Sequence, residues 1–260
     1  MGLCDAQWSG SGPTAMPKVA IVAALEREVS GLTRSWNRVE QQYDGRRFVF
    51  LERDDVVVVY GGIGLDAARR AAEAVIASYH PTQLHSVGFA GALDGELRVG
   101  DIIAPSVVID ARDGSRAFVA GVDNQNALVT YMSVAGVQQK KQLAHAFGAK
   151  AVDMEAAAVV AAADAHGIPF AATKVISDES NFEIPEMDRF IDGHGHFRTV
   201  NFAVFIALRP WLWTRVAALA RNSRKAARAL GGHLERWVHD LSLRSEPVAA
   251  AGGLHAGSSK

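Results

Sequence analysis

The stretch from Ala151 to Asp178, AVDMEAAAVVAAADAHGIPFAATKVISD, decides the fold of this chain. It opens with a short apolar strand that ends in acids, and the alanine-rich run from Glu155 to Ala165 predicts a helix. Gly167 ends this helix, and PFAATKVISD is typical of a buried strand that ends at Asp178. A strand, a helix and a second strand of this size predict a βαβ unit with parallel, adjacent strands.

Two acids of this stretch, Glu155 and Asp178, are then expected at the carboxyl ends of parallel strands. Open α/β sheets bind their ligands at that edge, so the two acids predict a ligand site. Acids at strand ends and helix starts also cap helices or complement the helix dipole, and this structural role is the more common one. Spacing alone leaves both roles open.

Length and composition limit the classes of protein to which this chain can belong. A chain of 260 residues forms one large α/β domain or two small ones. The 27 basic and 28 acidic residues are balanced, so we expect no nucleic-acid partner. Cys4 is the only cysteine, which excludes a disulfide within the chain and fits a reducing, cytoplasmic location. No apolar run reaches transmembrane length, no signal peptide is recognisable, and we predict neither a metal nor another cofactor.

The residues before this stretch alternate between strand and helix patterns. Lys18–Leu25 is a continuous apolar run typical of a central strand, and Glu28 lies in the first turn of the helix that follows. Arg46–Glu52 and Asp55–Tyr60 predict a hairpin that leads into the glycine turn Gly61–Gly64. Such a turn lets a ligand approach the backbone closely. Without the GxGxxG order or a P-loop lysine, it is equally compatible with a purely structural turn.

These patterns predict a single-domain α/β fold, a three-layer sandwich with a twisted mixed, mainly parallel sheet flanked by helices. The further expected elements are a helix at 66–79, a strand at 84–90, a strand continuing to residue 110, strands at 116–122 and 128–133, and a helix at 135–147. We place the domain at residues 18–243, between a disordered lead (1–17) and a disordered tail (244–260).

A helical C-terminal extension is expected over residues 199–243, with an amphipathic helix that begins at Pro210 and bends at Gly231-Gly232. Its apolar and basic side chains are Phe202, Phe205, Ile206, Leu208, Trp211, Leu212, Trp213, Arg209, Arg215, Arg221, Arg224, Lys225 and Arg228. This combination predicts peripheral contact with an anionic membrane surface. A helix packed on the core or at a dimer interface would explain the same pattern.

Several separated segments together are similar to one family. They are AIVAALEREV at Ala20–Val29, GGIG at Gly61–Gly64, VGFAGAL, VGDII, AVDMEAAAV at Ala151–Val159, and VISD at Val175–Asp178. In this order they resemble the nucleoside phosphorylase/nucleosidase family, which includes methylthioadenosine/S-adenosylhomocysteine nucleosidases and purine nucleoside phosphorylases. The resemblance implies a single α/β domain around a twisted mixed sheet, and an enzyme that cleaves the N-glycosidic bond of a purine nucleoside.

The resemblance also implies a role for each acid. Asp178 corresponds to the acid that protonates or hydrogen-bonds N7 of the purine, and Glu28 to the base that activates water. Glu155 corresponds to the carboxylate that holds the ribose hydroxyls, with Met154 packed under the sugar. A general acid at the purine relieves the charge on the leaving group, and carboxylates stabilise the developing positive charge on the sugar. The predicted substrate-binding set is completed by Phe89, Ala90, Gly91, Gly64, Lys174 and Ser177.

Departures from the family pattern bear on the reaction. Related phosphorylases hold phosphate with an Arg just before the Val-Gly pair and a Ser just after it, where this chain has Ser86 and Phe89. Losing these anion donors favours hydrolysis by water. Lys174, four residues before Asp178, is expected either to orient water or an anion or to be a surface side chain. Phosphorolysis and a nucleoside-binding protein without catalysis are the alternatives.

The shorter segment before AVDME and the long Trp/Arg-rich tail resemble the hopanoid-associated phosphorylase branch of this family. That resemblance implies an apolar 5′-substituted adenosine, such as adenosylhopane, as the small-molecule substrate. We also expect a homodimer. The aromatic-bearing loop by which nucleosidases stack on adenine is not recognisable in residues 130–138, which leaves the identity of the substrate open.

Overall fold

The computed structural model describes residues 19–183, 190, 195 and 212–245. Its strands are β1 (Val19–Ala23), β2 (Asn37–Tyr43), β3 (Arg46–Arg53), β4 (Val56–Tyr60), β5 (Gln83–Ala92), β6 (Ile102–Ile103), β7 (Val107–Asp110), β8 (Arg116–Phe118), β9 (Ala127–Thr130), β10 (Ala151–Asp153) and β11 (Phe170–Asp178). Its helices are α1 (Glu26–Thr33), α2 (Leu65–Tyr79), α3 (Val137–Phe147), α4 (Ala156–Ala165) and α6 (Trp213–Ser245). The expected lead, the first part of the extension and most of the tail lie outside the described residues.

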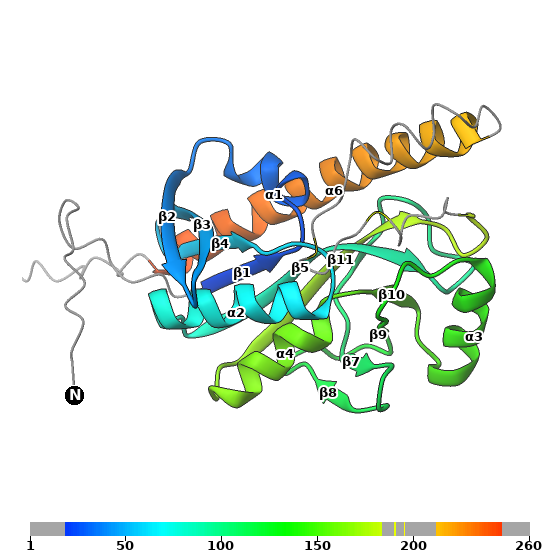
Figure 1. Ribbon diagram of the computed structural model, residues 1–260, viewed down its shortest axis with the longest axis horizontal. Helices are drawn as coiled ribbons and strands as arrows, with labels where there is room; N and C mark the ends of the chain where they lie inside the picture. The colour runs from blue at the N-terminus through cyan, green and yellow to red at the C-terminus, as the bar shows by residue number, and fades with distance from the viewer. Residues whose placement is uncertain (1–18, 184–189, 191–194, 196–211, 246–260) are drawn as a thin grey trace, which may run out of the picture.

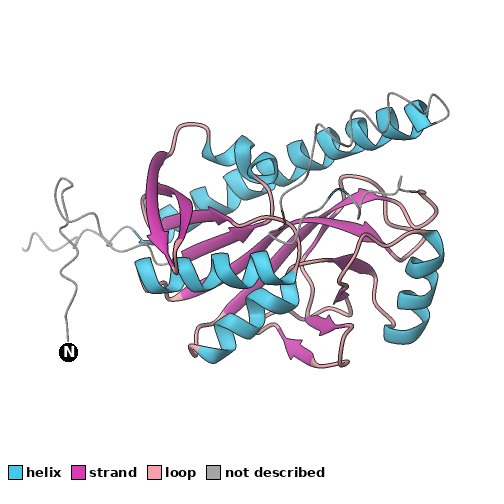
Figure 2. Ribbon diagram, viewed as in Figure 1, coloured by secondary structure: helices cyan, strands magenta, loops and turns pink. Residues whose placement is uncertain are grey.

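A single twisted mixed sheet forms the middle layer, as Figures 1 and 2 show. Its main path runs β2-β3-β4-β1-β5-β10-β9-β7-β8, and β11 lies beside β5 with β6 beyond it. The strands β1, β4, β5 and β11 run parallel to one another at its centre. The predicted hairpin is confirmed, because β3 and β4 pair antiparallel.

Helices cover both faces of the sheet, which confirms the predicted sandwich (Figure 1). Successive residues of β1 face opposite sides: Ala20 packs with α2 and α4, whereas Ile21 packs with α1 and α6. Because both faces are covered, the strand can be apolar at every position. The core therefore lies in two layers, one on each side of the strands that lead to the cavity described below.

The predicted βαβ unit at Ala151–Asp178 is wrong in its strand arrangement. β10 pairs with β5 antiparallel, whereas β11 pairs with β5 parallel, so the two strands run in opposite directions and β5 separates them. The direction of β10 is set by its parallel partner β9, a contact that the local pattern does not encode. Val152 and Asp178 nevertheless both pair with Gly91 of β5, which brings the two acid-bearing strand ends to one level of the sheet.

Other boundaries also differ from the predictions. β2 was not predicted, because its sequence NRVEQQY is polar, as suits a strand at the edge of a sheet. The strand expected to continue to Asp110 is two strands, β6 on β11 and β7 on β9. The helix α6 passes through Gly231 without a break, and a Cβ atom on Gly31 would lie 3.4 Å from the Gly231 Cα atom. This glycine pair lets α1 and α6 approach closely rather than bending the helix.

The C-terminal helix α6 is part of the core. Ala226, Leu230, Leu234 and Val238 are buried against the sheet and α1. Within the described part of the chain, no helix has the length and apolar character needed to cross a membrane.

We expect Leu230→Ala to lower the free energy of unfolding by about 2–5 kcal/mol, because it removes a fully buried side chain and leaves a cavity. Urea denaturation measures this change. Leu243→Ala on the same helix is the control, since Leu243 is 60 % exposed and its loss should change stability by less than about 0.5 kcal/mol. Equal effects of the two substitutions would show that α6 is not packed as described.

Candidate active site

One cavity of about 650 Å³ lies where β1, β5, β10 and β11 end, between α3 and α6. The structure brings eight of the ten predicted site residues to its wall: Glu28, Phe89, Ala90, Gly91, Met154, Glu155, Ser177 and Asp178. The other two, Gly64 and Lys174, lie behind this wall and contact residues that form it. Three acids from distant parts of the chain therefore share one cavity.

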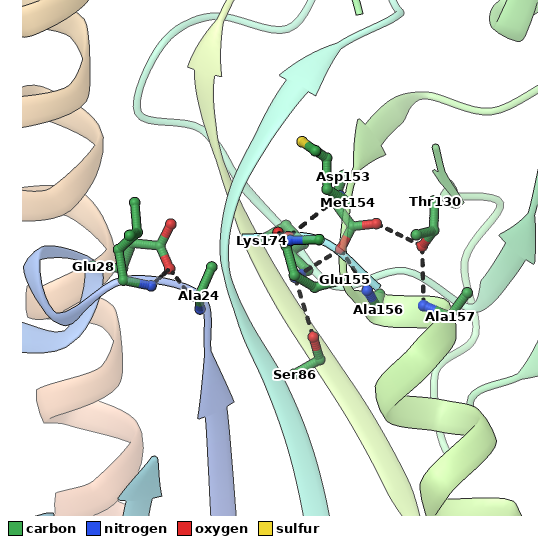
Figure 3. A network of polar contacts seen from close by, with 12 residues as sticks. Ala24, Glu28, Ser86, Thr130, Asp153, Met154, Glu155, Ala156, Ala157 and Lys174 are labelled. Atoms are coloured by element: carbon green, nitrogen blue, oxygen red, sulfur yellow. Dashed lines mark hydrogen bonds and ion pairs between the residues drawn. The ribbon is translucent and has the colours of Figure 1, made fainter. Parts of the chain in front are cut away.

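Glu28 faces the cavity from the first turn of α1. Its carboxylate accepts the backbone N–H groups of Ala24 at 3.1 Å and Leu25 at 3.2 Å, so it also caps the helix (Figure 3). Gly88 has φ +148°, and a Cβ atom there would lie 3.0 Å from the Glu28 Oε2 atom. Burial raises the pKa of Glu28, and the bond from Leu25 and the charge of Lys174 oppose this only in part. A carboxyl group with a raised pKa is a stronger base near neutral pH than an exposed one.

Glu155 lies just before α4 and is held by two backbone donors. Its Oε1 atom accepts the N–H of Gly64 at 2.9 Å, and its Oε2 atom accepts the N–H of Met154 at 3.2 Å. The glycine turn therefore positions Glu155 through Gly64, and its Ile63 lines the cavity. Burial, and then the negative charge of Asp153, raise the pKa of Glu155 to about 8.

Lys174 is buried behind the acids and is neither a surface side chain nor part of the cavity wall. Its Nζ atom lies 2.8 Å from the Asp153 Oδ2 atom and donates to the Ser86 hydroxyl at 3.1 Å, as Figure 3 shows. Burial lowers the pKa of Lys174, but Asp153 and Glu155 outweigh it, so the net pKa is raised and the side chain stays an ammonium. Asp153 also accepts the Thr130 hydroxyl at 2.6 Å. The sequence showed no sign of this pairing, because Lys174 and Asp153 lie on strands separated by β5.

Asp178 occupies the opposite end of the cavity from α1 and is held by two side chains. Its Oδ1 atom accepts the Ser177 hydroxyl at 2.6 Å, and its Oδ2 atom forms an ion pair with the Nζ atom of Lys140 on α3. Lys140 also donates to the backbone carbonyl of Glu179 at 2.7 Å. Sequence reasoning missed Lys140, because a lysine in a polar helix beside a second lysine is typical of a solvent-exposed face.

Comparison with known proteins identifies the family. The model of the phosphorylase superfamily matches residues 18–135 and 127–200, which is more than half of the chain. The chain belongs to this superfamily. A 5′-methylthioadenosine/S-adenosylhomocysteine nucleosidase of Shewanella sediminis is 28 % identical over 216 residues, covering 69 % of this chain and 94 % of that protein. A nucleosidase of the same name from Staphylococcus aureus is 25 % identical over 204 residues, covering 64 % of this chain and 88 % of that protein.

Solved structures share the fold at lower identity. The methylthioadenosine/S-adenosylhomocysteine nucleosidase of Helicobacter pylori has a TM-score of 0.64 at 16 % identity, covering 86 % of this chain and 99 % of that one. The futalosine hydrolase of the same organism has a TM-score of 0.60 at 17 % identity, covering 85 % and 98 %. The predicted family, its fold and an enzyme of the nucleosidase and phosphorylase class are thereby confirmed. The hopanoid-associated branch stays a prediction.

The raised pKa of Glu155 predicts that stability falls as pH rises. Its unfolded carboxyl ionises near 4.5, whereas the folded one keeps its proton up to about 8. The folded state therefore binds more protons across this window, and the free energy of unfolding decreases with increasing pH. Glu155→Gln cannot ionise and should show a smaller decrease in urea denaturation between about pH 5 and pH 8. Glu26→Gln, on a side chain that is 58 % exposed, is the control; a Glu155→Gln slope as steep as the wild-type slope would contradict the assignment.

Proposed function

We propose that the protein is an N-ribosyl hydrolase that releases adenine from an adenine nucleoside. The observation that carries this proposal is that Glu28, Glu155 and Asp178 line one cavity. The superfamily match and the nucleosidase names of the curated relatives support the same reaction. The three acids have the residue types that the reaction needs at the water, the sugar and the base.

The proposed reaction separates charge across the cavity. When the bond between the sugar and the purine breaks, the sugar becomes oxocarbenium-like and the purine gains a negative charge. Glu28 takes a proton from the attacking water, and its raised pKa suits it to that task. Glu155 holds the ribose hydroxyls, and its ionised form stabilises the positive charge on the sugar. The Asp178 end of the cavity receives the purine.

Hydrolysis is favoured over phosphorolysis by the charges around the reaction centre. Glu28 and Glu155 line the cavity there, and the ammonium of Lys174 is already paired with Asp153. The Ser86 hydroxyl is buried and accepts a hydrogen bond from Lys174, and Phe89 has no hydroxyl, so neither residue supplies one to a phosphate ion. A dianion beside these carboxyl groups would make their ionisation still more costly, whereas water carries no such cost. Phosphorolysis and binding without catalysis remain the alternatives that the experiment below separates.

One wall of the cavity supports an apolar 5′ substituent. The helix α6 contributes the apolar residues Val216, Leu219, Ala220 and Ala227 to this wall, together with Ser223, Arg224 and Arg228. An apolar group such as the one in adenosylhopane would bury surface there at roughly 25 cal/mol per Å². We therefore propose a 5′-substituted adenosine as the substrate class.

We expect the purified protein to release adenine and free ribose sugar without phosphate. Glu28→Gln should lower kcat about 10²–10⁴-fold because it removes the base. Asp178→Asn should remove nearly all activity because it removes the carboxylate at the purine end of the cavity. The matched control is Glu26→Gln, since Glu26 is exposed on the same helix and should keep wild-type activity. The assay is a panel of adenosine derivatives with increasingly apolar 5′ groups, with and without phosphate. Ribose 1-phosphate formed only with phosphate would instead establish phosphorolysis, and binding without any turnover would establish an inactive protein.

Peripheral membrane contact through the C-terminal helix is a separate proposal. Most of the aromatic residues predicted for it lie outside the described residues, but Arg221 and Arg224 are exposed on α6. Contact of such residues with anionic lipid contributes about 1 kcal/mol per charge, or roughly fivefold in affinity.

A cytoplasmic location and a homodimer also remain predictions; sedimentation of the purified protein tests the dimer.

Arg221→Glu should weaken binding of the full chain to anionic vesicles by at least roughly fivefold, because it reverses one charge on α6. Vesicle co-sedimentation measures this change. Truncation before α6 is not a suitable test, because Leu230 and Leu234 belong to the core. Arg47→Glu is the control, since its side chain is 78 % exposed on the β2–β3 hairpin. If the two variants bind alike, the α6 contact is refuted.

A further inference from the structure

We propose that Lys140 is the proton donor to the leaving base, and that Asp178 acts as its ion-pair partner and as an acceptor for the base. This inference rests on the proposed function and assigns a role to a residue that the sequence analysis did not select. Lys140 lines the same cavity as the three acids. It lies at the end that holds Asp178.

The position of Lys140 is costly for a cation. The side chain is 1 % exposed, and lysine is almost never fully buried unless it is paired. It lies near the N-terminus of α3, where the helix dipole disfavours positive charge. Its neighbour Lys141 is exposed, whereas Leu143, three residues further along α3, is buried. Lys140 and Leu143 therefore lie on the side of α3 that faces the core. A lysine at such a position needs a compensating interaction, which Asp178 provides in part.

The hydrogen bonds of Lys140 leave one donor available. An ammonium group has three N–H donors. One meets the Asp178 carboxylate and a second meets the carbonyl of Glu179. The described part of the chain offers no hydrogen-bond acceptor to the third N–H, although the group lies on the cavity wall. A buried donor beside a cavity points to an acceptor on the ligand.

The ion pair matches one edge of adenine. That edge carries N7, which accepts a hydrogen bond, beside the 6-amino group, which donates one. Lys140 supplies the donor and the Asp178 carboxylate supplies the acceptor, so the pair is complementary to both. A 6-oxopurine presents two acceptors there, and the second would face the carboxylate. The pair therefore also selects a 6-amino base over a 6-oxo base.

The charges of the Lys140–Asp178 pair indicate which group donates the proton to the purine. A carboxylate bonded to an ammonium carries no proton to give, so the ammonium is the source. As the bond between the sugar C1′ and purine N9 breaks, its electrons enter the purine, and N7 takes a proton from the Lys140 Nζ atom. Water adds its oxygen to C1′ and passes a proton to Glu28. After product release the Lys140 amine regains a proton from solvent and Glu28 loses one, so a nucleoside and water become a sugar and adenine.

The first test separates proton donation from a structural role. Lys140→Met keeps an unbranched side chain one atom shorter but has no proton to give, and Lys141→Met is the matched surface control. We expect Lys140→Met to lower kcat on adenine nucleosides about 10²–10⁴-fold. Its activity on p-nitrophenyl β-D-ribofuranoside, whose leaving group departs without protonation, should fall less than about tenfold. Equal losses on both substrates would overturn the proposal.

The second test uses only the wild-type protein, so it holds even if Lys140→Met does not fold. Adenosine should be cleaved with kcat/KM at least about tenfold above that of inosine, because O6 would face the Asp178 carboxylate. Equal rates on the two nucleosides would overturn the proposal. A wild-type protein that cleaves no adenine nucleoside would refute the proposed function itself. Activity that Lys140→Met retains in full would refute only the role of Lys140.

Discussion

The buried ion pair between Lys174 and Asp153 joins β11 to β10 across the strand that separates them. Both side chains are almost completely buried, and the Nζ and Oδ2 atoms lie 2.8 Å apart. Removing two charges from water costs several kcal/mol each, so this pair is weak as a source of stability. Its value lies in position, because it places a positive charge directly behind Glu155 and Glu28.

The buried charges around the cavity bear on the raised pKa values of Glu28 and Glu155. Four buried acids, Glu28, Asp153, Glu155 and Asp178, face two buried lysines, Lys140 and Lys174. If all six were ionised, the group would carry a net charge of −2 in a poorly solvated place. The pKa values of Glu28 and Glu155 rise because burial disfavours their charged forms, and the positive charge of Lys174 offsets this only in part. Perturbed acids around a cavity are a common property of enzyme sites.

The helix α6 connects the hydrophobic core to the cavity wall. One side of it packs Leu230 and Leu234 into the core, and another lines the cavity with Leu219 and Ala227. A change in the core side of α6 would therefore also move the wall that we propose for the 5′ substituent. The expected C-terminal extension is in this sense part of the domain and not an appendage.

The sequence by itself determined the class of fold and most of the elements, because apolar runs and glycine stops are local signals. The three acids were selected through the family resemblance and not from these local signals. The sequence also supported the family through separated segments that keep their order. It did not reveal that β10 and β11 run in opposite directions, because β9 and β5 decide this through long-range pairing. Only the tertiary structure buried Lys140 and Lys174 beside their acids, because a lysine's partner comes from another element and leaves no trace in its own neighbourhood.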